Sequence, residues 1–118
     1  MPMKPYSRSN RVGGLIQQVL AQLMRKDISD PRLANTTITA VKMSRDLRIA
    51  RIYFATEKGA EKQKAAREGF ERARGYIKRE LAQRLELRYM PDLKFFYDDA
   101  IDRGARIEKL IKMVNEND

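Results

Sequence analysis

The sequence of 118 residues contains no cysteine, no histidine and no tryptophan. The absence of cysteine excludes disulfides and thiol nucleophiles, and the absence of histidine excludes imidazole bases and the usual zinc sites. Carboxylates remain as metal ligands, and their one cluster is Asp98, Asp99 and Asp102. A helix start explains Asp98 or Asp99, and Arg103 and Arg106 can pair with the other carboxylates. We therefore predict no catalytic residue, no metal and no cofactor, with a small magnesium-dependent nuclease as the alternative.

Long hydrophobic runs are also missing. The apolar runs are a few residues long, whereas a membrane-spanning helix needs about 20 residues. The N-terminal residues MPMKPYSRSNRVGG lack the apolar core of a signal peptide. These absences predict a cytoplasmic protein that has no membrane partner. A chain of this length is expected to form one domain over residues 1–118, with residues 1–9 and 115–118 flexible.

Acidic residues are scarce relative to basic ones, because 16 aspartates and glutamates face 25 lysines and arginines and leave a formal charge of +9. The excess is uneven: residues 1–26 hold five basic and no acidic residues, residues 59–90 carry +4, and residues 91–118 carry −2. Clustered cations release condensed counterions when they meet phosphates. The distribution predicts a polyanionic partner that meets the N-terminal helix and the middle of the chain. The alternative is a charge that serves only solubility.

Helical spacing of apolar residues predicts a first helix from Val12. Ser9 or Asn10 is the candidate N-cap, and the Asp30-Pro31 pair marks a turn beyond the helix. A final helix is expected to follow Asp98 or Asp99. The two apolar stripes consist of Val12, Leu15, Ile16, Val19, Leu20, Leu23 and Met24, and of Ile107, Leu110, Ile111 and Val114.

Alternation of apolar and polar residues predicts three strands. Residues 36–44 and 48–56 are rich in β-branched and aromatic residues and should form a hairpin, and residues 93–97 a third strand. The hairpin loop, Ser44-Arg45-Asp46-Leu47, is expected to span four or five residues. The facing of Ile38, Tyr53 and Phe96 and the strand order stay open. The faces expected to pack on helices carry Val41 and Met43, then Ala50, Ile52 and Phe54, then Leu93, Phe95 and Tyr97.

The segment from Lys64 to Leu85 predicts helix on both sides of Gly75. A glycine inside a helix costs roughly 1 kcal/mol relative to alanine, so Gly75 invites an explanation. We interpret Ala73-Arg74-Gly75 as a bend that joins two short helices. The elements in this order predict an α+β fold, a small three-stranded sheet covered on one face by helices. The inward spine of the bent segment consists of Ala66, Phe70, Ala73, Ile77, Leu81 and Leu85.

Several short motifs occur in a fixed order along the chain. Each motif is weak alone, but their order and spacing are specific. The motifs are Asp30-Pro31-Arg32-Leu33, Ser44-Arg45-Asp46-Leu47, Ala50-Arg51-Ile52-Tyr53, Ala73-Arg74-Gly75, Leu85-Glu86-Leu87-Arg88-Tyr89 with Pro91, Leu93 and Phe95, Tyr97-Asp98 and Gly104-Ala105-Arg106-Ile107. With these residues the sequence resembles the ribosome-binding factor A family of small bacterial assembly factors over nearly its whole length.

The resemblance implies a single KH-like domain of the second type, in which an Ala-x-Gly bend between two helices replaces the usual Gly-x-x-Gly loop. The six glycines of this sequence indeed form no Gly-x-x-Gly. The resemblance also implies a protein that is not an enzyme and that binds the free or immature small ribosomal subunit near the 5′ end of its rRNA. Late maturation, rRNA processing and growth in the cold are the processes it is expected to support. Other assembly factors are candidate partners, no small-molecule substrate is expected, and the chain is expected to be a monomer.

The candidate RNA-binding residues are basic and come from three segments. Lys64, Arg67, Arg74 and Lys78 share one helical ridge, and Arg74 at the bend is also placed to stack on a base. A solvated helix face paired by glutamates is the alternative for the ridge, and an adaptor that recognises an acidic protein surface is the alternative function. Arg48 and Arg51 are as well explained by an exposed edge strand. The full predicted set is Arg8, Arg11, Arg45, Lys64, Arg67, Arg74, Lys78 and Arg79.

Overall fold

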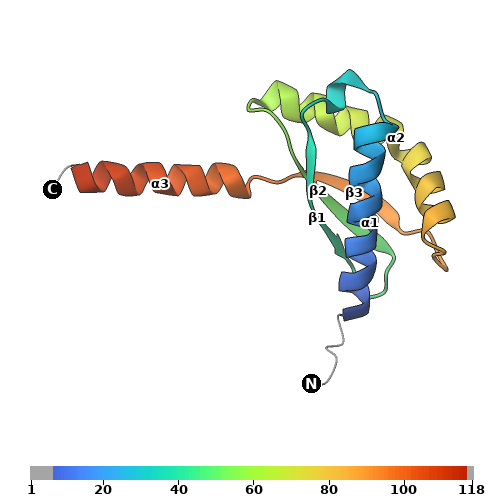
Figure 1. Ribbon diagram of the computed structural model, residues 1–118. Helices are drawn as coiled ribbons and strands as arrows, with labels where there is room; N and C mark the ends of the chain where they lie inside the picture. Colours follow the sequence, from blue (N-terminus) through green and yellow to red (C-terminus); the bar gives the residue numbers. More distant parts are fainter. Residues whose placement is uncertain (1–6, 117–118) are drawn as a thin grey trace.

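The computed structural model describes residues 7–116 and shows a small mixed sheet with helices on one side and a projecting final helix (Figure 1). The terminal residues 1–6 and 117–118, which belong to the segments expected to be flexible, lie outside the described residues. The elements are α1 (Ser7–Lys26), a single 3₁₀ turn η1 (Pro31–Leu33), β1 (Thr37–Met43), β2 (Ile49–Ala55), α2 (Ala60–Arg84), β3 (Asp92–Tyr97) and α3 (Ala100–Glu116).

Helix α1 begins before the apolar stripe that predicted it. Ser9 and Asn10 were the predicted caps, but the helix starts at Ser7, so this prediction was wrong. Apolar spacing marks the residues that contact the core, and the first turns carry polar residues that leave no such signal. Farther along, Ile16 and Leu20 are fully buried, as the stripe predicted. At the other end, Asp30 caps η1, its side chain accepting a hydrogen bond from the Arg32 amide at 2.9 Å.

The sheet has the order β1-β2-β3, with β1 antiparallel and β3 parallel to β2. Helix α2 supplies the long crossover that a parallel pair requires. The predicted inner faces of β2 and β3 are confirmed, because Ile52, Phe54 and Leu93 are fully buried. The arrangement is α+β with one helix-covered face, and it is compatible with the KH-like fold that the resemblance implied.

The register of β1 explains why Ile38 fell out of phase with its strand. The pairing shifts between Ile38, which lies opposite Phe54, and Ala40, which lies opposite Tyr53. Thr39 is therefore an extra residue in β1, a β-bulge that reverses the alternation. Ile38 thus returns to the inner face, where its side chain is 7% exposed.

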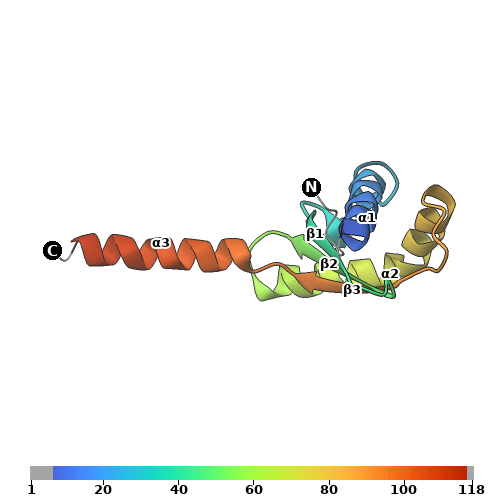
Figure 2. The ribbon, with the colours of Figure 1, turned by 90° about the horizontal axis from the view of Figure 1, so that it is seen from below.

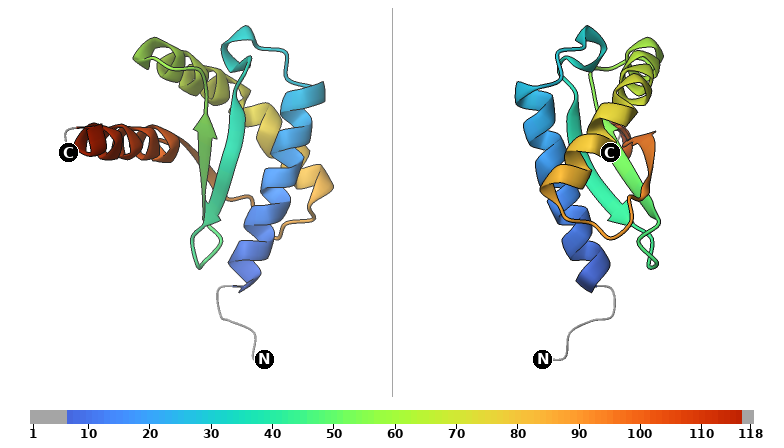
Figure 3. Two further views of the ribbon diagram at one scale, coloured as in Figure 1. Left: turned by 60° about the vertical axis from the view of Figure 1, so that its left-hand side comes forward. Right: turned by 90° about the vertical axis from the view of Figure 1, so that its right-hand side faces the viewer.

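The core lies between the sheet and the two helices α1 and α2. The right-hand view of Figure 3 shows these helices in front of the strands. The ring of Phe70 on α2 is stacked on Phe95 of β3, with ring centroids 4.9 Å apart, and lies 5.0 Å from the ring of Phe54 on β2. These three rings join α2 to two strands at once. Aromatic contacts of this kind stabilise by about 0.5–1.5 kcal/mol beyond the area they bury.

Where two short helices joined at Ala73-Arg74-Gly75 were predicted, the structure has one helix, α2, which runs without interruption for 25 residues. Its ribbon changes direction about midway along its length (Figure 1). A methyl group on Gly75 would meet only the end of the Arg79 side chain, at an ordinary 3.7 Å. The space around Gly75 therefore does not require glycine.

Two other glycines are required by close packing. A Cβ on Gly13 would lie 2.8 Å from the backbone oxygen of Val41, so glycine lets α1 approach β1. A Cβ on Gly69 would lie 2.9 Å from the Leu33 side chain, so glycine lets η1 dock on α2. Real Cβ atoms do not come this close to a backbone atom without displacing it.

Arg74 fastens α2 to β3. Its guanidinium donates to the backbone oxygen of Leu93, pairs with Glu71 at 2.6 Å, lies 3.8 Å from the Asp92 carboxylate and sits 5.3 Å from the centre of the Phe95 ring. The side chain is only 28% exposed. Arg74 is therefore a structural residue as well as a predicted binding residue.

Helix α3 projects away from the rest of the domain (Figure 1 and Figure 2). Asp98 or Asp99 was the predicted cap, and the Asp98 Oδ1 accepts a hydrogen bond from the amide of Ala100, the first residue of α3, at 3.0 Å. The predicted stripe on this helix does not cover the sheet: Ile107, Leu110, Ile111 and Val114 are between 55% and 62% exposed.

Replacing Gly75 by alanine should stabilise the domain. Because the site has room for a methyl group, the Gly75→Ala variant gains helix propensity without a clash, and the free energy of unfolding should rise by about 0.5–1 kcal/mol. The Gly13→Ala variant is the matched control and should lose stability, since its Cβ meets the Val41 oxygen. Urea denaturation monitored by circular dichroism measures both, and a loss of stability in Gly75→Ala would show that the bend needs glycine.

Removing the Arg74 guanidinium should loosen α2 from β3. The Arg74→Gln variant loses charge-assisted hydrogen bonds to Glu71 and Leu93, and its free energy of unfolding should fall by about 1–2 kcal/mol. Arg67→Gln, an exposed arginine of the same helix, should change stability by less than about 0.5 kcal/mol. Equal stability of Arg74→Gln and the unaltered chain would contradict the fastening role.

Candidate nucleic-acid interface

A groove of about 990 Å³ opens where three distant segments meet. The segments are the first turns of α1, the hairpin loop between β1 and β2, and residues 86–92 after α2. Five arginines line the groove, against three acidic residues. We call it the arginine groove, and its arginines are Arg8, Arg11, Arg45, Arg48 and Arg88.

The parallel pairing of β2 with β3 builds this groove. The register begins with Ile49 opposite Asp92, and the Asp92 amide donates to the backbone oxygen of Arg48 at 2.7 Å. Residues 86–91 are therefore held beside the hairpin loop, although about 40 positions separate them in sequence. Arg8 and Arg11 face the same space because α1 crosses over β1, with Gly13 in close contact with Val41.

Internal hydrogen bonds give the hairpin loop one defined shape. The Ser44 hydroxyl donates to Asp46 Oδ1 at 2.6 Å, and the Arg48 amide donates to the same oxygen at 3.1 Å. These two donors hold the pKa of the Asp46 carboxyl below its ordinary value, because both stabilise its charged form. Leu47 completes the turn with a left-handed backbone, at φ 62°. Arg45 is exposed at the tip of this ordered loop.

An exposed aromatic ring lies on the rim of the arginine groove. Tyr89 is 75% exposed, and the guanidinium of Arg88 lies 5.7 Å from its ring centre. Arginines provide forked donors that match phosphate oxygens, and an exposed ring offers a face on which a base can stack. The groove therefore combines the two kinds of side chain that contact single-stranded or irregular RNA.

The structure divides the predicted site residues into two groups. Arg8, Arg11 and Arg45 come together in the arginine groove. The other predicted residues lie along α2 and do not line it. Lys64, Arg67 and Arg79 are exposed, Lys78 is half-buried, and none of the four has an ion-pair partner among the residues that the structure describes.

Two arginines and one aromatic residue of the groove were not among the predicted site residues. Arg48 was assigned equally well to an exposed strand edge, and Arg88 and Tyr89 were quoted only as part of a family motif. The sequence carries only a weak signal that these three residues belong to the groove, because only the strand order brings residues 86–92 beside the hairpin loop.

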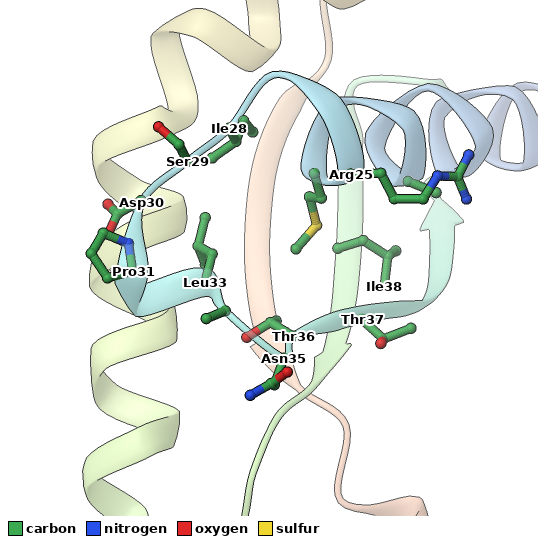
Figure 4. A pocket seen from close by; sticks show the side chains of 13 residues that line it. Arg25, Ile28, Ser29, Asp30, Pro31, Leu33, Asn35, Thr36, Thr37 and Ile38 are labelled. Atoms are coloured by element: carbon green, nitrogen blue, oxygen red, sulfur yellow. The ribbon is translucent and has the colours of Figure 1, made fainter.

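A second hollow, of about 450 Å³, is less suited to a polyanion. It lies between the end of α1, η1 and the start of β1, and Figure 4 shows Ile28, Leu33 and Ile38 pointing into it. Arg25 is its one lining arginine. The predicted acidic cluster lies partly outside the described residues; among the side chains that the structure does describe, no group of three or more potential ligands could hold a metal ion. Asp102 has no described side chain.

None of the helices in the described part of the chain is both long and apolar enough to cross a membrane.

Comparisons with known proteins give one consistent result. A family model described as ribosome-binding factor A matches residues 8–111. The ribosome-binding factor A of Desulfatibacillum aliphaticivorans is 48% identical over 116 residues, which cover 98% of this chain and 94% of that relative. The crystal structure of ribosome-binding factor A from Thermus thermophilus matches with a TM-score of 0.67 and 26% identity, over 75% of this chain and 94% of that one.

A further solved structure is a Thermus thermophilus ribosome-binding factor A homology model fitted into a cryo-EM map of a 30S complex. It is 26% identical to this chain, with a TM-score of 0.64, and the match covers 77% of this chain and 96% of that one. The family model spans α1 to most of α3, and the sequence identity extends over almost the whole chain. The chain therefore belongs to the ribosome-binding factor A family.

Proposed function

We propose that this chain binds the small ribosomal subunit through its ribosomal RNA and acts there without catalysis. The observation that carries the proposal is the arginine groove, in which three separate segments bring five arginines and Tyr89 to one place. A Thermus thermophilus family member whose model was fitted into a map of its 30S complex supports the choice of partner. A folded RNA surface provides the phosphates and unstacked bases that such a groove recognises.

The basic residues of α2 extend this contact. Lys64, Arg67 and Arg79 have no ion-pair partner in the described part of the chain, so phosphates compete with no internal salt bridge for them. Arg74 contributes mainly by holding α2 in place on β3. Contacts of this kind fix position and orientation, while a stacked base at Tyr89 gives preference for an unpaired nucleotide.

The resemblance to the family supports a finer form of the proposal. The RNA contacted lies near the 5′ end of the small-subunit rRNA, and binding favours late maturation and rRNA processing, particularly in the cold. The cytoplasm is the compartment where this partner occurs. Other assembly factors bind the same particles and are further candidate partners.

An adaptor that recognises an acidic protein surface is the second candidate, because the same exposed cations would serve it. Ribonuclease treatment of the complex separates the two functions. An RNA-binding factor loses its partner when the RNA is digested, whereas an adaptor keeps it.

Charge reversal in the arginine groove should weaken binding about a hundredfold without unfolding the domain. The double variant Arg11→Glu/Arg45→Glu changes two exposed side chains, and each lost charge-assisted contact weakens binding about tenfold. The log-log dependence of affinity on salt should become shallower by about 0.7–0.9 per lost contact. Sedimentation with purified small subunits over a series of salt concentrations measures both quantities.

Two further variants locate the surface. Lys64→Glu/Arg67→Glu tests the α2 contact and should give a smaller loss of affinity. Arg25→Glu is the charge control, because Arg25 is exposed in the last turn of α1, far from the first turns that line the groove. This variant should bind nearly as tightly as the unaltered chain. Full binding by Arg11→Glu/Arg45→Glu, with an unchanged thermal melt, would contradict the proposed surface.

A further inference from the structure

The sheet has a second face that α1 and α2 leave uncovered. Side chains of a strand alternate, so residues next to the buried Ile52 and Phe95 in sequence point to the opposite side. In the left-hand view of Figure 3 no helix lies in front of β1 and β2. We call this side the open face. Its central residues are Lys42, Arg51, Tyr53, Lys94 and Phe96.

Three cations form one row across the open face. Lys42 is the register partner of Arg51, and Arg51 is the register partner of Lys94. All three are exposed, and none has an ion-pair partner among the described residues. Like charges directly opposite each other destabilise a sheet. The row therefore lowers the stability of the free protein, and an anion bound across it would relieve the repulsion.

Two aromatic rings lie in the adjacent row of the same face. Tyr53 and Phe96 are register partners, with ring centroids 5.6 Å apart and an interplanar angle of 31°. Phe96 is 37% exposed, and the ammonium group of Lys42 lies 5.7 Å from the centre of the Tyr53 ring. The aromatic pair and the cation row are thus neighbours on a flat surface.

We propose that the open face is a second RNA-binding surface, which takes a single strand with a base on Phe96 and Tyr53 and phosphates on the cation row. This inference rests on the proposed function, because it assigns a second surface to the same RNA partner. Sheet surfaces that stack bases on aromatic residues are an established way to bind unpaired RNA. Neighbouring strands are about 4.8 Å apart, so the row spans roughly 10 Å, enough for adjacent phosphates.

Charge favours RNA over the other occupants of this face. The exposed stripe of α3 is apolar, so folding α3 back would place Ile107 and Leu110 against cations that it does not neutralise. A second copy of the open face would bring two rows of like charge together. A single-stranded polyanion neutralises the row and covers Phe96 at the same time.

The Arg51→Glu variant separates a role of Arg51 in RNA binding from a role in the stability of the sheet. A glutamate between Lys42 and Lys94 forms favourable cross-strand pairs, so the melting temperature should stay equal or rise. Affinity for a labelled single-stranded oligoadenylate should nevertheless fall by about tenfold, since a phosphate contact becomes a repulsion. Fluorescence anisotropy and a thermal melt measure the two effects in the full chain.

The Phe96→Leu variant tests stacking separately from charge. Leucine keeps an apolar side chain but has no ring face, and the loss of one stacked base should weaken oligoadenylate binding by about five- to hundredfold.

Lys26→Glu, at the end of α1, is the charge control for Arg51→Glu. It should bind oligoadenylate within about threefold of the unaltered chain, because solvent ions screen distant charges.

The outcomes separate this inference from the proposed function. Normal oligoadenylate binding by Arg51→Glu and Phe96→Leu, together with lost small-subunit binding by Arg11→Glu/Arg45→Glu, overturns the open face and leaves the arginine groove standing. Weaker binding of these two variants to small subunits alone, with unchanged oligoadenylate binding, identifies a protein occupant and also overturns the inference. Unchanged binding of every variant to both ligands overturns both proposals.

Discussion

The contact of Phe70 with Phe54 and Phe95 is the interaction on which the rest of the structure depends. Through this contact the first half of α2 packs on both β2 and β3. The position of α2, which connects these two strands, is thereby defined relative to their parallel pair. Because all three rings lie on one side of the sheet, the helices gather there and the other side stays open. The parallel register in turn brings residues 86–92 beside the hairpin loop.

Surface charge follows from this one-sided core. Most apolar side chains of α1, α2 and the strands are buried on the inner face of the sheet. The excess of cationic side chains therefore lies on three outward surfaces. These are the arginine groove, the exposed ridge of α2 and the row across the open face. The proposed function requires at least the first of them.

Periodic patterns predicted most of the fold. The stripe of α1 and the alternation of β2 and β3 were sufficient because each reports burial of a single face. The pattern failed where local structure departs from the period: the bulge at Thr39 reversed the phase of Ile38, and the polar first turn of α1 carried no apolar signal. The stripe of α3 was correctly periodic but is exposed, since periodicity cannot tell which partner covers a helix.

The candidate site was less predictable than the fold. Arg45 was predicted because it lies at a loop tip, whereas Arg48 and Arg88 line the same groove only through the strand register. Arg74 was predicted to bind RNA, but in the structure it contacts Leu93 and Asp92 of its own chain. The sequence gives no signal that distinguishes such an arginine from an exposed one on the same helical ridge.

The most direct test of RNA binding through the arginine groove is zero-length photocrosslinking on small-subunit particles, with identification of both the RNA nucleotide and the attached residue. The structure predicts crosslinks from the hairpin loop around Arg45 and from the segment containing Tyr89, joined to ribosomal RNA. Crosslinks confined to α3, or joined only to ribosomal proteins, would contradict it.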